Sequence, residues 1–125
     1  MSNPHKGRVG ADRLIHAARN SKAGLNVAFR DEQAFRQECW IAIVLTPLAF
    51  WVGRSWLEVV LLIGSLLFVL IVELLNSAVE ATVDRISFEC HELSKRAKDI
   101  SSAAVFLSLV TCAAIWATAL WQRLS

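Results

Sequence analysis

The sequence has little charge and no framework of cysteines. Charged residues make up 19% of the 125, and the net charge is only +2, which is too small to indicate a nucleic-acid partner. The three cysteines show neither a CxxC pair nor the spacing of metal ligands. An odd number without such spacing argues against a disulfide scaffold. These features exclude a disulfide-rich domain and a nucleic-acid-binding one.

The sequence also lacks the motifs of soluble catalytic folds. It contains no GxxxxGK[ST] phosphate loop, no HRD or DFG of a protein kinase, no GxSxG turn and no HExxH zinc motif. Residues 1–38 are polar and charged, without the apolar core of a cleavable signal peptide. We therefore expect the chain to enter a membrane through its own spans and to use chemistry outside these motifs.

Apolar residues are abundant, since 55% of the chain is hydrophobic and the mean hydropathy is +0.46. A soluble domain of this size cannot bury so much apolar surface, whereas a bilayer accepts it. The run 100–122 is uncharged and long enough to cross a bilayer. We predict one all-α membrane domain, residues 1–125, with transmembrane helices at about 31–53, 57–85 and 97–122. Asp31 and Ser94 are the predicted N-caps of the first and third spans.

The distribution of Lys and Arg predicts the orientation of these spans. Of the 13 basic residues, seven precede the first span, one lies in the first connection, four in the second and one in the tail. Cytoplasmic loops carry an excess of Lys and Arg. The N-terminus and the second connection are therefore predicted to be cytoplasmic.

Residues 11–29 have a different pattern, with Leu14, Ile15 and Leu25 on one helical face and Arg13 elsewhere. The pattern is typical of an amphipathic helix lying in the membrane interface. A soluble amphipathic helix packed on the protein itself is the alternative.

Four polar side chains mark a candidate site in the second span, where Glu73, Asn76, Glu80 and Asp84 follow one another at steps of three, four and four. These steps keep them on one narrow helical face. An ionisable group inside an apolar membrane segment is costly and usually functional. The same leaflet is predicted to hold polar residues at the starts of the other spans: Glu32, Lys98, Asp99 and Ser102.

Such a cluster suits phosphoryl transfer at a membrane surface. Magnesium binds through one or two carboxylates together with phosphate oxygens, and a lysine balances phosphate charge. Glu73, the deepest carboxylate, is placed to accept a proton from an alcohol. Alternatively, the face is polar glue between helices or an ion pathway, and Lys98 and Asp99 are interfacial charges that reach toward water.

Three segments resemble signatures of the prokaryotic diacylglycerol kinase family: EQAFRQE (32–38), VELLNSAVEATVDRI (72–86) and HELSKRAKDISSAAV (91–105). The resemblance covers nearly the whole chain. It implies transfer of the γ-phosphoryl group of MgATP to diacylglycerol, giving phosphatidic acid. It also implies a homotrimer among the lipids of the bacterial inner membrane, with active sites shared between neighbours.

The resemblance also implies roles for individual residues. Glu73 matches the catalytic base, Asn76 orients it or the phosphate, and Glu32 and Glu80 hold the metal and touch ATP. Further ATP-contacting positions are Arg13, Asn20, Glu89, Cys90, His91, Lys98 and Asp99. Lipid-contacting positions are Arg13, Ala17, Ala34, Phe35, Arg36, Gln37, Glu38, Glu73 and Ser102. The helix 17–29 resembles the cover over the site where lipid enters.

Three positions depart from the family pattern. Asn20 stands where many members carry an aromatic residue, and Lys95 and Ser101 stand where glycines are common.

Two rival functions remain at this point. Undecaprenol kinases share the motif, although the N-terminal helix and the third-span motif read like the diacylglycerol branch. A membrane scaffold or ion-conducting bundle would use the same carboxylates without catalysis.

Overall fold

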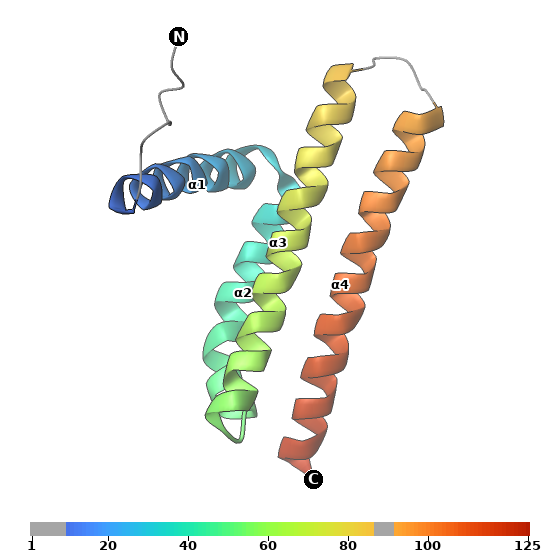
Figure 1. Ribbon diagram of the computed structural model, residues 1–125. Helices are drawn as coiled ribbons and strands as arrows, with labels where there is room; N and C mark the ends of the chain where they lie inside the picture. The colour runs from blue at the N-terminus through green and yellow to red at the C-terminus, as the bar shows by residue number, and fades with distance from the viewer. Residues whose placement is uncertain (1–9, 87–91) are drawn as a thin grey trace.

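The computed structural model describes residues 10–86 and 92–125, and nearly all of these are helical. The helices are α1 (Ala11–Asp31), α2 (Gln33–Val52), α3 (Trp56–Ile86) and α4 (Glu92–Leu124). Figure 1 shows α2, α3 and α4 running alongside one another, while α1 projects sideways from them and ends where α2 begins. The predicted all-α class is confirmed.

One residue separates α1 from α2. Glu32 has an extended backbone, with φ −109° and ψ 108°, and its side chain makes no capping hydrogen bond. Asp31, the predicted N-cap of the second helix, is instead the last residue of α1, so that prediction is wrong. The position of this break depends on contacts between the two helices and cannot be read from the capping preference of a single residue.

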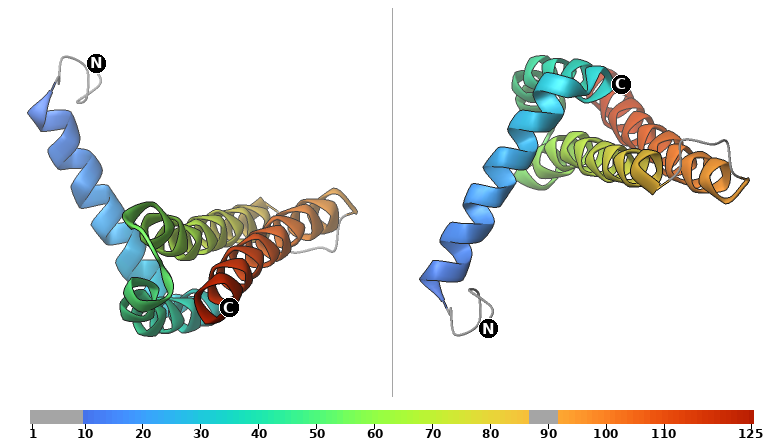
Figure 2. Two further views of the ribbon diagram at one scale, coloured as in Figure 1. Left: turned by 90° about the horizontal axis from the view of Figure 1, so that it is seen from below. Right: turned by 90° about the horizontal axis from the view of Figure 1, so that it is seen from above.

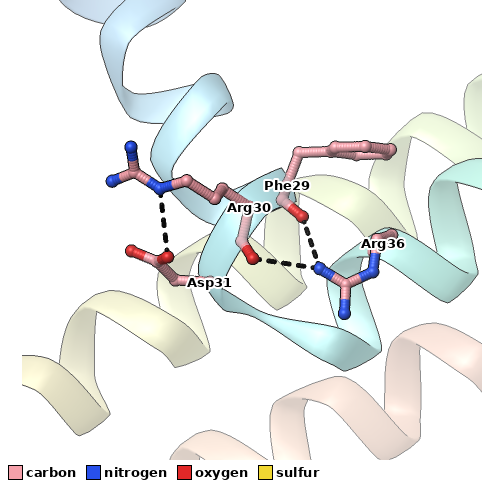
Figure 3. A network of polar contacts seen from close by, with 4 residues as sticks. All are labelled: Phe29, Arg30, Asp31 and Arg36. Atoms are coloured by element: carbon pink, nitrogen blue, oxygen red, sulfur yellow. Dashed lines mark hydrogen bonds and ion pairs between the residues drawn. The ribbon is translucent and has the colours of Figure 1, made fainter.

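The break is held by the side chain of Arg36 in the first turn of α2. Its Nη1 donates to the carbonyl oxygens of Phe29 at 2.9 Å and Arg30 at 3.0 Å (Figure 3). The last carbonyls of a helix have no partner within the helix and attract a positive charge. Arg36 therefore caps α1 from α2 and fixes the angle between them.

At the other end of the bundle, a tight turn joins α2 to α3. Gly53 has no room for a side chain, because an added Cβ would lie 2.6 Å from Cγ2 of Val59. Ser55 Oγ accepts a hydrogen bond from the backbone N–H of Glu58 at 3.2 Å, as an N-cap of α3 does. Pro47 lies within α2 without ending it, as membrane helices tolerate.

The fourth helix begins earlier than predicted. It starts at Glu92, so Ser94 lies within its first turn and the prediction of Ser94 as N-cap is wrong. The charged residues just after Glu92, predicted to belong to the connection between spans, are part of the helix. Charged residues are compatible with a helix exposed to water, and the acidic Glu92 complements the positive end of the helix dipole. The helix can therefore begin before the apolar run.

A small core joins α2, α3 and α4 near the tight turn: Ala49, Val52, Leu62 and Ala119. Beside it, Trp116 Nε1 lies 3.1 Å from Ser65 Oγ and 3.3 Å from the carbonyl oxygen of Leu62. Ser65 Oγ also lies 3.4 Å from Cys112 Sγ. Polar contacts of this kind link helices in membranes, where apolar surface alone gives little drive to associate.

Two helices of the described residues, α3 and α4, are long and apolar enough to cross a membrane. Only 33% and 11% of their most apolar stretches are buried. The core helix of a soluble protein would be mostly buried, so these faces require another apolar environment. α2 does not reach the hydropathy required of a membrane span, because its first turns carry polar residues such as Arg36 and Glu38.

Replacing Arg36 should loosen the end of α1. Arg36→Ala removes two charge-assisted hydrogen bonds at an exposed site, worth about 1 kcal/mol together, or about fivefold in local opening. Hydrogen exchange in detergent should therefore accelerate in the last turn of α1. Arg30→Ala is the control. The Arg30 side chain pairs with the exposed carboxylate of Asp31, and the substitution leaves the carbonyl of residue 30 in place. Equal exchange in both variants would refute the capping role.

Removing the Ser65 hydroxyl should weaken the contact between α3 and α4. Interhelical hydrogen bonds in membranes contribute about 0.5–1.5 kcal/mol, so Ser65→Ala should lower the free energy of unfolding in mixed micelles by that amount. Thr111→Val should change it by less than about 0.5 kcal/mol, since the hydrogen bond of Thr111 Oγ1 stays within α4, to Leu107 O at 2.9 Å. A larger loss in the Thr111 variant would contradict this assignment.

Candidate functional site

The predicted polar face of α3 runs from the protein interior to its surface. Glu73 is 6% exposed and Asn76 is 9% exposed. Glu80, one turn further on, is half-buried, and Asp84 is exposed. The face therefore leads from a buried carboxylate to the exposed end of the helix.

Asn76 links this face to α4. Its Nδ2 donates to Glu80 Oε1 at 3.2 Å, a contact between neighbours four residues apart on the helix. Its Oδ1 accepts a hydrogen bond from Ser101 Oγ at 2.7 Å. The amide thus joins a carboxylate of its own helix to a hydroxyl of the next one.

An ion pair also connects α3 to α4, nearer the ends of these helices. Lys98 Nζ lies 2.6 Å from Asp84 Oδ1, across the gap between α4 and α3. Asp99 instead pairs with Lys95 of its own helix at 2.7 Å, on the exposed surface. Exposed pairs contribute little stability, but the first fixes the alignment of the two helices beside the candidate site.

Three other carboxylates lie within electrostatic range of Glu73. The charge of Glu73 is repelled by those of Glu80 and Glu32, and the charge of Glu38 is repelled by that of Glu73. Glu32 comes from the α1–α2 break and Glu38 from α2, so three segments contribute. This clustering of like charges suits the binding of a cation.

One carboxylate oxygen of this group is not used in a hydrogen bond within the described residues, so it could bind such a cation. Glu38 Oε2 is buried and has no hydrogen-bond partner within residues 10–86 and 92–125. In the same ranges, no three His, Cys, Asp or Glu residues lie close enough to complete a metal site alone. Magnesium does not need one, because it keeps waters and phosphate oxygens among its ligands.

A groove of about 730 Å³ separates α1 from α3 next to these carboxylates. Glu32 is its acidic lining residue. The others are small or apolar: Ser21, Ala23, Gly24, Leu25, Val27, Ala28, Leu74, Ser77, Ala78 and Ala81. A groove that is mostly apolar and has one carboxylate in its lining fits a ligand of the same character.

Several predicted contact residues lie away from this group in the single chain. Arg13, Ala17 and Asn20 are exposed on the part of α1 that extends away from the other helices (Figure 2). Ala34, Gln37 and Ser102 are also exposed, whereas Phe35 is buried. The predicted ATP contacts Glu89, Cys90 and His91 lie outside the described residues.

Ser101 is the site residue that the sequence did not reveal. In the sequence, Ser101 stood out for one reason: it occupies a position where glycine is common in the family. It lies one turn after Lys98, so both residues occupy the side of α4 that meets α3. That spacing from a charged residue is the signal that would have identified it.

Comparison with known proteins decides the family. The family model described as "Prokaryotic diacylglycerol kinase" matches residues 19–120. The chain belongs to the prokaryotic diacylglycerol kinase family. Its relatives include proteins named diacylglycerol kinase from Pseudomonas aeruginosa, 51% identical over 94% of this chain and 96% of the relative. Those from Haemophilus influenzae and Escherichia coli K12 are 49% identical (86% of this chain, 92% of the relative) and 46% identical (92% and 94%).

Membership makes this chain a kinase that phosphorylates an alcohol group. The alternative of a scaffold or ion-conducting bundle without catalysis is therefore wrong. Together with the apolar, exposed faces of α3 and α4, it also identifies a membrane protein.

Proposed function

We propose that the protein transfers the γ-phosphoryl group of MgATP to the primary hydroxyl of diacylglycerol and forms phosphatidic acid. The observation that carries the proposal is the buried carboxylate of Glu73, within electrostatic range of Glu32 and Glu80. Relatives at 46–51% identity that are named diacylglycerol kinase support the choice of alcohol. Undecaprenol kinase of the same family is the alternative.

Glu73 acts as the general base in this proposal. It takes the proton of the lipid hydroxyl while the hydroxyl oxygen forms a bond to the γ-phosphorus. The bond from that phosphorus to the bridging oxygen breaks, and ADP leaves. General-base help is worth roughly two to four powers of ten in rate, and positioning and charge neutralisation supply the rest. The burial of Glu73 keeps water away from this step.

Glu32 and Glu80 would hold the magnesium ion, with the unpartnered oxygen of Glu38 nearby. When bound, the ion neutralises charge on the phosphates of ATP. Asn76 holds one oxygen of Glu80 and leaves the other for the cation. Lys98, which faces α3, would balance phosphate charge.

The groove between α1 and α3 would receive the lipid. Its lining suits an acyl chain, and Glu32 marks the end where the polar head meets the carboxylates. In this arrangement α1 is an interfacial helix that covers the lipid. Lipid contacts from residues 34–38 and Ser102 would complete the site.

The proposed setting is the bacterial inner membrane, with three transmembrane helices and a cytoplasmic N-terminus. The distribution of Lys and Arg supports this orientation. We propose a homotrimer: a neighbouring subunit would shelter carboxylates such as that of the half-buried Glu80 from lipid, and the number three is what the resemblance to the family implies. The extended start of α1, with Arg13 and Asn20, would then serve a neighbour's nucleotide site.

The purified protein should phosphorylate diacylglycerol in mixed micelles with MgATP, and Glu73→Gln should lower kcat by roughly two to four powers of ten. Formation of radiolabelled phosphatidic acid is the measurement. Glu58→Gln is the control, since Glu58 lies at the opposite end of the same helix. Full activity in Glu73→Gln would show that Glu73 is not the general base. Faster phosphorylation of undecaprenol than of diacylglycerol would show that undecaprenol is the preferred substrate.

Replacing either metal-binding carboxylate should change the magnesium requirement. Glu32→Gln and Glu80→Gln should each raise the Mg²⁺ concentration for half-maximal rate at least about tenfold, because a neutral amide is a weaker magnesium ligand than a carboxylate. Rates measured against Mg²⁺ at fixed ATP test this. An unchanged magnesium midpoint in both variants would show that the cation is held elsewhere.

A further inference from the structure

A hydroxyl group of α4 reaches the candidate site from across the helix pair. Ser101 is half-buried, and its Oγ lies 2.7 Å from Oδ1 of Asn76 on α3. This is the usual length of a hydrogen bond from a hydroxyl donor. It is made by residues 25 positions apart in sequence, so it depends on the alignment of the two helices.

The partners of Asn76 determine which way its amide points. The carboxylate of Glu80 can only accept, so the Nδ2 group must face it, and this places Oδ1 toward Ser101. The flipped amide would set an oxygen against the carboxylate. The hydroxyl of Ser101 also lies 3.0 Å from the carbonyl oxygen of Lys98 in its own helix, but the contact with Asn76 is the shorter one.

We infer that Ser101 is a positioning residue for the metal-binding carboxylate. Its hydroxyl holds the Asn76 amide in the orientation that fixes Oε1 of Glu80, so that the other carboxylate oxygen is directed to the cation. A donor on the amide oxygen also polarises the amide and strengthens the bond that its N–H makes. The inference rests on the proposed role of Glu80 in holding magnesium.

A purely structural role for Ser101 makes a different prediction. The ion pair of Lys98 with Asp84 already joins α3 to α4 one turn nearer the helix ends. If Ser101 only added a second joint, its loss would lower stability and maximal rate and leave the magnesium requirement unchanged. If it positions Glu80 through Asn76, the magnesium requirement itself must change, because outer partners of metal ligands affect metal affinity.

The test compares three variants of the full-length protein in detergent. Ser101→Ala should raise the Mg²⁺ concentration for half-maximal phosphorylation of diacylglycerol about tenfold, with a smaller fall in maximal rate. Ser101→Thr keeps the hydroxyl and should return that midpoint to within about twofold of the wild type. Ser108→Ala is the matched control, because this buried α4 hydroxyl donates within its own helix, to Val105 O at 2.7 Å. Its midpoint should equal that of the wild type.

A second readout needs no turnover. ATP should protect the wild-type protein against thermal unfolding in a magnesium-dependent manner, and Ser101→Ala should shift that dependence by the same factor. If the wild type shows this protection but phosphorylates neither diacylglycerol nor undecaprenol, the proposed function fails while the role of Ser101 stands. A midpoint in Ser101→Ala within twofold of the wild type, or no recovery in Ser101→Thr, would overturn the inference. Absence of magnesium-dependent protection in the wild type, together with no phosphorylation of either alcohol, would overturn both.

Discussion

Repulsion between the buried carboxylate of Glu73 and its half-buried carboxylate neighbours is the constraint on which this structure depends. Glu73 sits almost without exposure, and the charges of Glu32 and Glu80 act on it unfavourably. Such a group would be eliminated from an apolar helix that served only to span a membrane. The surrounding contacts hold the carboxylates together against this repulsion. Family membership explains why the arrangement persists, because a kinase must bring a negatively charged nucleotide to the membrane.

Two helix pairs maintain the arrangement. The pairing of α3 with α4 is fixed by Trp116 and Ser65 near the tight turn, and by Asn76 with Ser101 at the other end. The pairing of α1 with α2 is fixed by Arg36, whose guanidinium holds the end of α1. Little of this depends on a large core, because each chain buries few apolar residues. Polar contacts therefore carry much of the geometry, as expected where surrounding lipid is as apolar as the protein.

The sequence predicted what depends on a single helix and missed what depends on two. The period of the helix alone places Glu73, Asn76 and Glu80 on one face, and long apolar runs alone predict the all-α class. The roles of Asp31 and Ser94 as caps were wrong, since helix ends follow tertiary contacts. The contact of Ser101 with Asn76 requires the alignment of α4 against α3. No pattern within either helix contains that information.

The single extended residue between α1 and α2 has a mechanical consequence. Glu32 is both the joint between these helices and an acidic wall of the groove beneath α1. A swing of α1 about this joint must carry the Glu32 backbone with it, because no slack residues lie between the helices to absorb the motion. If Glu32 binds the proposed cation, a ligand that fills the groove and moves α1 would also move a cation ligand, so the two binding events would be coupled.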